Sequence, residues 1–324
     1  MQRLVLIGLT VVLAFAAFAY LNNANLLAPA GNGRPLLLAH RGLAQIFSHV
    51  GLTGDTCTAA RMDPPEHPYL ENTLASMLAA FRAGADIVEF DIHPTADGDF
   101  AVFHDWTVDC RTNGTGVTRS HTLASLKALD IGYGYTADGG KTFPFRGQGI
   151  GLMPTLDEVL SAFPGKRFLI HIKSNDASEG EQLAAKLSEL PTPRLADLIV
   201  YGGNAPVASF AARLPAVRSM SRASLKSCLL GYFALGWTGY VPSACRHSMV
   251  LIPINYARWL WGWPNRFLQR LRNVGTDAYV LGAREEEEFS RGIDSEEEFR
   301  RLPAGYSGGI WTNRIDRIAP MTTR

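Results

Sequence analysis

The chain has 324 residues, of which 47% are hydrophobic and 19% are charged, a composition typical of a globular protein rather than a disordered one. The 31 Lys and Arg residues balance 30 Asp and Glu residues. The overall field is therefore too weak to attract nucleic acid, and we expect no nucleic-acid partner.

The first segment of the chain is apolar and uncharged. Residues Leu4–Leu21 are rich in Leu, Val, Ala and Phe, and at about 1.5 Å per residue they just span a bilayer core. The stretch is long for the core of a signal peptide, although Ala17-Phe18-Ala19 and Ala28-Pro29-Ala30 both fit the small-x-small cleavage pattern. We therefore expect residues 1–21 to be a signal peptide or a membrane anchor, with removal and retention both open, followed by a polar linker over residues 22–33.

This N-terminal segment predicts an exported protein, either periplasmic or held outside the cytoplasm by a membrane anchor. The four cysteines form no CxxC pair, so their spacing does not indicate zinc. An oxidising compartment favours two disulfides instead. Of the three pairings we expect Cys57–Cys110 and Cys228–Cys245, the second closing a short loop between a helix and the next strand; four unpaired buried thiols are the alternative.

The rest of the chain alternates short apolar runs with longer amphipathic stretches, which is typical of parallel strands joined by crossover helices. Eight such runs predict one α/β domain, a (β/α)8 TIM barrel over residues 34–324. The predicted strands are Pro35–Ala39, Ile87–Ile92, Arg167–Ile172, Asp197–Tyr201, Ala216–Met220, Met249–Ile254, Ala278–Leu281 and Gly309–Trp311. Predicted helices include Thr73–Ala83, Leu156–Ala162, Glu179–Glu189 and Glu285–Phe299, the last with the acidic run Glu285–Glu288 on a solvated face.

Two intervals are too long to be plain connections. Leu43–Leu70 is rich in Gly and Pro, and residues 93–151 are rich in Gly, Thr and Asp. In a barrel such additions collect at the carboxyl ends of the strands, where binding loops lie. A bond between Cys57 and Cys110 would join these two additions.

Two groups of polar residues follow predicted strands early in the chain. His40-Arg41-Gly42 comes directly after Leu36–Ala39, and offers a proton-transfer group beside a guanidinium that matches phosphate oxygens. Glu89 and Asp91 lie two residues apart on one strand, so both carboxylates face the same way. Carboxylates that converge repel unless a cation compensates them, which favours a hard divalent metal; arginines that hold a polar strand end are the alternative.

Two further groups come later. His104 follows the apolar run Val102-Phe103, and His171 and Lys173 share one face at the end of the third strand. Lys173 beside carboxylates is suited to hold phosphate or to stabilise a transition state.

The candidate residues form one pattern, which in chain order is His40-Arg41-Gly42, Glu71-Asn72-Thr73, Glu89-x-Asp91, His104-Asp105 and Lys173. This pattern resembles the glycerophosphodiester phosphodiesterase family, a metal-dependent group of TIM barrels. The resemblance implies a small inserted subdomain after the second strand, at about residues 93–151, which places His104 over the barrel mouth. It also implies that the substrate's own hydroxyl attacks the phosphate and forms a cyclic phosphate that water then opens. The implied roles are general acid and base for His40 and His104, phosphate binding for Arg41 and Lys173, metal binding for Glu89 and Asp91, and support for Glu71 and Asn72.

The sequence departs from this family at two places. The family has Glu-x-Lys on the third strand, and here His171 replaces the glutamate that is the third metal ligand. The resemblance implies Mg²⁺ or Ca²⁺, whereas an imidazole ligand suits Mn²⁺ or Zn²⁺ better. Three outcomes are open: His171 binds a softer metal, water replaces the missing oxygen ligand, or the metal site is impaired. The stretch Leu43–Leu70 is also longer than the family's, and would alter the substrate. The remaining histidines, which we expect to be structural, are His49, His67, His93, His121 and His247.

Together these features predict an exported, metal-dependent phosphodiesterase that hydrolyses glycerophosphodiesters to sn-glycerol 3-phosphate and an alcohol. One alternative is cleavage of lysolipids or glycolipids in the manner of phospholipase D or phospholipase C, favoured if the N-terminal segment stays as an anchor in the membrane. The other is a binding protein without catalysis on the same scaffold, suggested by His171.

Overall fold

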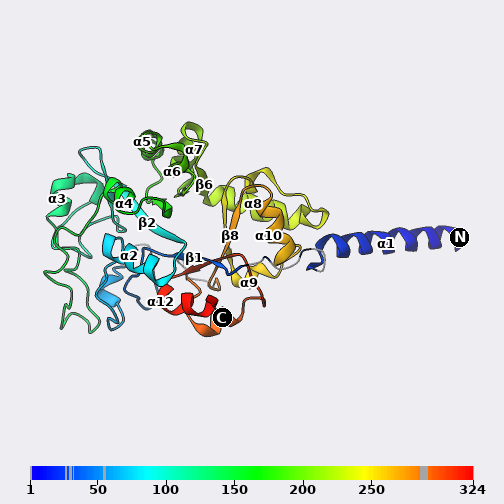
Figure 1. The fold of residues 1–324 in the computed structure, drawn as a ribbon, viewed down its shortest axis with the longest axis horizontal. Helices are drawn as coiled ribbons and strands as arrows, with labels where there is room; N and C mark the ends of the chain where they lie inside the picture. Colours follow the sequence, from blue (N-terminus) through cyan, green and yellow to red (C-terminus); the bar gives the residue numbers. More distant parts are fainter. Residues whose placement is uncertain are drawn as a thin grey trace.

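The computed structural model describes residues 2–25, 28, 31, 33–53, 56–284 and 291–323. Its centre is a barrel of parallel strands, from which an N-terminal helix, α1 (Gln2–Asn23), projects at one end (Figure 1). The proposed cleavage motif at Ala28-Pro29-Ala30 lies partly outside the described residues, and the acidic run Glu285–Glu288 lies wholly outside them.

Eight parallel strands form one sheet in the order β6-β5-β4-β2-β1-β9-β8-β7. Between β6 and β7 the described backbone shows no ladder, and the Ser248 hydroxyl donates to the Ser219 carbonyl at 2.7 Å instead. The nearly closed barrel confirms the predicted (β/α)8 class, and the strand limits differ from the predicted ones by two residues or fewer. The strands are β1 (Leu36–Ala39), β2 (Ile87–Pro94), β4 (Arg167–Ile172), β5 (Leu198–Gly202), β6 (Arg218–Ser221), β7 (Met249–Pro253), β8 (Asp277–Leu281) and β9 (Gly309–Thr312).

Helices cover the outside of the barrel (Figure 1). Thr73 caps α2 with a reciprocal bond to Ser76, and similar capping boxes begin α4, α8 and α11. The helices are α2 (Leu74–Ala83), α4 (Leu156–Ala162), α5 (Ala177–Ser188), α6 (Thr192–Leu195), α7 (Asn204–Arg213), α8 (Arg222–Leu235), α9 (Ile254–Ala257), α10 (Asn265–Arg272), α11 (Glu296–Arg300) and α12 (Ile315–Ile318). Short 3-10 turns are η2 (Ala59–Arg61), η3 (Thr118–Ser120), η4 (Gly236–Thr238), η5 (Ser243–Cys245) and η6 (Ala319–Thr323).

The predicted helix Glu285–Phe299 is wrong over most of its described length. Only α11 is helical there, and it begins after Ser295. Residues 291–294 form neither helix nor strand, and here the Ile293 amide donates to the Trp311 carbonyl and the Gly282 amide to the Arg291 carbonyl. These bonds hold the segment against β9, which a helix could not reach.

Alternation along β2 divides its side chains between two sides of the barrel wall. Val88, Phe90 and Ile92 pack outward against the helices, whereas Ile87 joins the apolar cluster inside the barrel with Leu38, Leu169 and Trp311. Glu89 and Asp91 continue the inward face toward the carboxyl end. The buried core therefore fixes where both carboxylates point.

The two long intervals form one subdomain beside β2. β3 (Phe100–Val102) pairs antiparallel with β2, and α3 (Leu123–Lys127) follows it. Val108, Leu126 and Ile131 from the insertion share a small core with Met62 and Leu70 from the earlier loop. The insertion therefore depends on the loop for part of its packing.

Both expected disulfides are present, Cys57–Cys110 and Cys228–Cys245. The first joins the loop to the inserted subdomain, and the second joins α8 to η5 ahead of β7.

Removal of Cys57–Cys110, which spans 53 residues, should lower the free energy of unfolding by about 4 kcal/mol on chain-entropy grounds, against about 3 kcal/mol for Cys228–Cys245. Urea denaturation of Cys57→Ala/Cys110→Ala and Cys228→Ala/Cys245→Ala measures both losses. An unchanged midpoint for the first variant would show that the bond adds nothing to the subdomain's stability.

Candidate active site

A left-handed turn follows β1 and places the first two site residues. The His40 amide still donates to the Thr312 carbonyl at 3.0 Å, and the backbone then turns at Arg41 (φ 57°) and Gly42 (φ 81°). A Cβ at Gly42 would lie 2.8 Å from the Ser76 carbonyl carbon, so the turn requires glycine. The turn aims His40 and Arg41 at the carboxyl end of the barrel.

His40 is oriented through its Nδ1 atom. Nδ1 lies 2.6 Å from Asn313 Oδ1, and the Asn313 amide donates to Asp294 Oδ2 at 2.7 Å. Because this bond fixes the amide, Nδ1 must carry the proton and Nε2 keeps its lone pair. Burial, followed by the positive charge of Arg41, lowers the pKa of His40 well below its usual value. His40 is thus a neutral imidazole whose Nε2 atom is an acceptor, and this atom accepts a hydrogen bond from Arg41 Nε at 3.2 Å.

The carboxylates of Glu89 and Asp91 are almost completely buried. The Tyr201 hydroxyl donates to Glu89 Oε1 at 2.7 Å, and the Arg41 amide donates to Oε2 at 3.1 Å. Burial, followed by the charge of Asp91, raises the pKa of Glu89 to about 8. Burial also opposes ionisation of Asp91, but Lys173 and other nearby cationic groups outweigh it and hold the pKa of Asp91 well below its usual range. Of the two carboxyls, Glu89 is therefore the one that more readily keeps its proton.

Asn72, Arg41 and Lys173 surround Asp91. The Asn72 amide donates to Asp91 Oδ2 at 3.0 Å and accepts from the Asp91 backbone amide at 3.1 Å. Lys173 Nζ lies 3.4 Å from Asp91 Oδ1, and Arg41 Nε lies 3.4 Å from Oδ2. At the other end of the Arg41 guanidinium, Nη1 lies 3.1 Å from Glu71 Oε1. Two cations thus lie beside the carboxylates, where an anionic group can also meet them.

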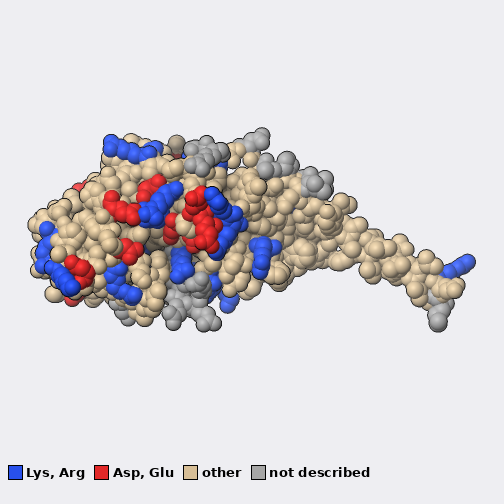
Figure 2. All heavy atoms as spheres, turned by 90° about the horizontal axis from the view of Figure 1, so that it is seen from below, with Lys and Arg blue, Asp and Glu red and all other residues tan. Residues whose placement is uncertain are grey.

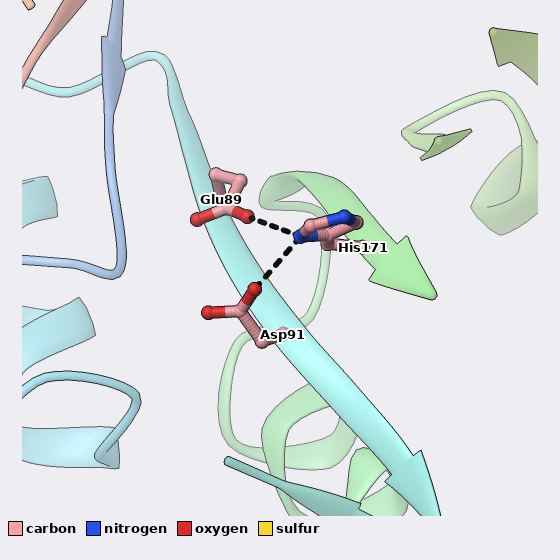
Figure 3. A group of neighbouring side chains, drawn as sticks. All are labelled: Glu89, Asp91 and His171. Atoms are coloured by element: carbon pink, nitrogen blue, oxygen red, sulfur yellow. Dashed lines mark hydrogen bonds and ion pairs between the residues drawn. The ribbon is translucent and has the colours of Figure 1, made fainter. Parts of the chain in front are cut away.

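His171 completes a cluster of three metal-ligand types. Its Nδ1 atom lies 2.8 Å from Asp91 Oδ1 and 3.9 Å from Glu89 Oε1, and Figure 3 shows both contacts converging on that nitrogen. The Tyr201 ring stacks on His171 at 4.2 Å. Burial, followed by Lys173, lowers the pKa of His171 to about 4, so the imidazole is neutral near pH 7 and one of its tautomers has a lone pair on Nδ1. Potential ligand atoms of the three residues lie within 4.8 Å of one another.

This donor set fits a divalent cation. Two carboxylates and one neutral imidazole are a ligand combination that proteins use for such ions. Burial and the charge of Asp91 raise the pKa of Glu89, and a cation bound beside it would favour its ionised form.

The inserted subdomain supplies His104. The Phe103 amide donates to the Asp91 carbonyl at 3.1 Å, which holds the start of this segment at the carboxyl end of β2. His104 Nδ1 lies 2.6 Å from Asp105 Oδ1, and Arg111 Nε donates to Asp105 Oδ2 at 2.9 Å. Burial opposes ionisation of Asp105, but Arg111 outweighs it and lowers the pKa of that carboxyl. Burial, then Arg41 and Lys173, lower the pKa of His104, and Asp105 acts in the opposite direction.

The structure brings the predicted site residues together at one end of the barrel, His40, Arg41, Glu71, Asn72, Glu89, Asp91, His104, His171 and Lys173. Sequence reasoning missed Tyr201 and Asn313, although both lie at the carboxyl ends of strands, which is a usable signal. It also gave no role to Asp294 and Arg111, for which no local signal exists.

A cavity of about 250 Å³ adjoins the site. It runs from His40 and Arg41 along the long loop to Phe47, His49 and Asp63. His49, which we expected to be structural, therefore lines this cavity. The loop that lengthens the chain is the part that shapes the space beside His40.

Comparison with known proteins finds a family to which part of this chain is similar. Residues 40–193 match the model of the glycerophosphoryl diester phosphodiesterase family, and all nine predicted site residues fall within them. A glycerophosphodiester phosphodiesterase of Bacillus subtilis is 36% identical over 172 residues, which are 51% of this chain and 48% of that protein. The chain thus spans about half the length of this curated relative.

Solved structures share the fold over a longer part of the chain. The glycerophosphoryl diester phosphodiesterase domain of a Mycobacterium tuberculosis protein covers 89% of this chain and is itself covered over 99% of its length, with a TM-score of 0.64 and 16% identity. An Oleispira antarctica phosphodiesterase, solved in complex with the product sn-glycerol-3-phosphate, covers 90% of this chain and is covered over 97% of its length, with a TM-score of 0.54 and 19% identity. Residues 40–193 are therefore similar in sequence to the glycerophosphoryl diester phosphodiesterase family, and the chain shares its barrel fold with solved structures of that family.

Proposed function

We propose that this protein is an exported, divalent-metal-dependent phosphodiesterase that hydrolyses glycerophosphodiesters to sn-glycerol 3-phosphate and an alcohol. The observation that carries the proposal is a pair of histidines, His40 and His104, each held by a hydrogen bond at Nδ1. They lie in one electrostatic cluster with the cations Arg41 and Lys173 and with the buried carboxylate pair. The names of the curated relatives and the sn-glycerol-3-phosphate in the Oleispira antarctica structure support this substrate class.

The two histidines have different partners, which assigns them different roles. His40 faces a neutral amide and is a base through Nε2, taking the proton from the substrate hydroxyl that attacks phosphorus. His104 faces the Asp105 carboxylate, which favours an imidazolium, so it donates a proton to the departing alkoxide as the P–O bond breaks. Water then opens the cyclic phosphate with the two roles reversed.

Arg41 and Lys173 would hold the phosphate oxygens, and Glu71 keeps the Arg41 guanidinium in place from its far side. Asn72 holds Asp91 at both its side chain and its backbone. Glu89, Asp91 and His171 would hold the divalent ion. The two carboxylates suit Mg²⁺ or Ca²⁺, and the imidazole favours Mn²⁺ or Zn²⁺. A bound ion would neutralise charge that develops on the phosphate.

Export is supported by two independent features. Within the described chain α1 is the one helix long and apolar enough to cross a membrane, and two disulfides are typical of an oxidising compartment. If α1 stays in the membrane, a lysolipid becomes a second candidate substrate, since its phosphodiester lies at the bilayer surface.

The His40→Ala and His104→Ala variants should each lose activity by about 10²–10⁴-fold, because each removes one proton-transfer group. Turnover of glycerophosphocholine by the full chain measures this. His247→Ala, an exposed histidine far along the chain, is the matched control and should keep the parent rate. Parent-like rates for His40→Ala and His104→Ala would contradict the assignment and would favour a binding protein.

Asp105→Asn tests the assignment of His104 as the acid. Asp105 raises the pKa of His104 against its surroundings, so loss of its charge lowers that pKa. An acid must be protonated, and activity falls as pH rises through its pKa. The alkaline limb of the kcat/KM profile should therefore move to lower pH, with a lower maximum rate. A limb that stays in place, or moves to higher pH, would contradict the role.

A further inference from the structure

The end of α1 is built into the folded domain. Asn22 and Asn23 donate to the Trp237 carbonyl at 3.0 and 2.9 Å, and Asn25 accepts from the Asn265 amide at the start of α10 at 3.1 Å. The buried Arg270 guanidinium donates to Asn23 Oδ1 at 2.9 Å and to the Asn22 carbonyl at 2.8 Å. Loss of residues 22–25 would leave a buried cation without two of its acceptors.

The body of α1 leaves the domain directly at η4. Its mean hydropathy is 2.6 over an 18-residue window, none of which is buried. The ring centroids of Phe15 and Phe18 lie 5.0 and 6.4 Å from the ring centroid of Trp237. The apolar helix and the domain surface around its exit are therefore continuous.

Large apolar side chains are exposed around this exit. Phe233 on α8 is 58% exposed and Trp259 after α9 is 60% exposed, and the Trp261 indole donates to the Phe233 carbonyl at 2.9 Å, which joins the two segments. α8 and α10 are the helices nearest to α1 in Figure 1, and Figure 2 shows few charged side chains where the domain narrows toward α1. We call this surface the aromatic patch, formed by Leu230, Phe233, Leu235, Tyr240, Trp259 and Trp261.

The same part of the chain is strongly basic. Residues 198–276 contain nine Lys or Arg residues and no Asp or Glu, although the whole chain has a net charge of only +1. Lys226 is exposed four residues before Leu230 on α8, and the Arg258 guanidinium lies 5.0 Å from the Trp259 ring. Tryptophan and tyrosine beside basic side chains are typical of a surface at the lipid–water interface.

We propose that the aromatic patch lies on an anionic phospholipid bilayer in which α1 remains embedded. The inference rests on the export stated above, and it adds that the domain itself is a lipid-binding surface.

The full chain, reconstituted into vesicles of phosphatidylglycerol and phosphatidylcholine with brominated acyl chains, tests the proposal through quenching of tryptophan fluorescence. Trp259→Phe and Trp261→Phe should each lower the fraction of fluorescence that the brominated lipid quenches. Trp106→Phe is the matched control, an exposed tryptophan of the inserted subdomain, and should not lower it. An unchanged quenched fraction in both Trp259→Phe and Trp261→Phe would overturn the proposal.

Charge reversal tests the anionic lipid. Lys226→Glu/Arg258→Glu should reduce the quenched fraction in these vesicles, whereas Lys141→Glu/Arg146→Glu on the inserted subdomain should not. Equal quenching in the wild type and the first variant would overturn the anionic surface. None of these measurements requires turnover, so they stay decisive if the proposed hydrolysis fails.

Discussion

Two carboxylates buried side by side are the constraint on which the site depends. Glu89 and Asp91 lie on the inward face of β2, because Val88 and Phe90 must pack outward against the helices. Their mutual repulsion is offset by Arg41, Lys173 and the Tyr201 hydroxyl. Burial and the charge of Asp91 nevertheless raise the pKa of Glu89. A divalent cation beside His171 would oppose that rise.

The histidines depend on supports that come from different parts of the fold. His40 is held by Asn313, which follows the last strand, and Asn313 is held in turn by Asp294 from an earlier loop. His104 is held by Asp105, which Arg111 binds, and both belong to the inserted subdomain. Since Arg111 also bonds Glu71, the subdomain is tied to the barrel through the site itself. The Cys57–Cys110 bond and the shared small core keep that subdomain in place. Stability of the insertion and geometry of the proposed acid are therefore linked.

Periodicity and strand ends were sufficient to predict the barrel and the residues that meet at its carboxyl end, whereas Glu71, Asn72 and the role of His104 came from the resemblance to a known family. Parallel strands bring their carboxyl ends to one edge, so His40, Asp91 and Lys173 had to converge once the strands were recognised. The same rule could have found Tyr201 and Asn313. Asp294 could not be found, because its position depends on the hydrogen bonds of Gly282 to Arg291 and of Ile293 to Trp311 on β9. Local propensity favoured a helix there, and tertiary bonds to the barrel prevailed over it.

The most direct test of this account is calorimetric titration of Mn²⁺ into the full chain and into Glu89→Gln, with Glu181→Gln, an exposed carboxylate on α5, as the control. The account predicts one Mn²⁺ per chain in the wild type and the control, and loss of that binding in Glu89→Gln. His171→Glu should bind Mg²⁺ more tightly than the wild type, because an oxygen replaces nitrogen. Undiminished Mn²⁺ binding by Glu89→Gln, or no binding by the wild type, would contradict the central role of the carboxylate pair.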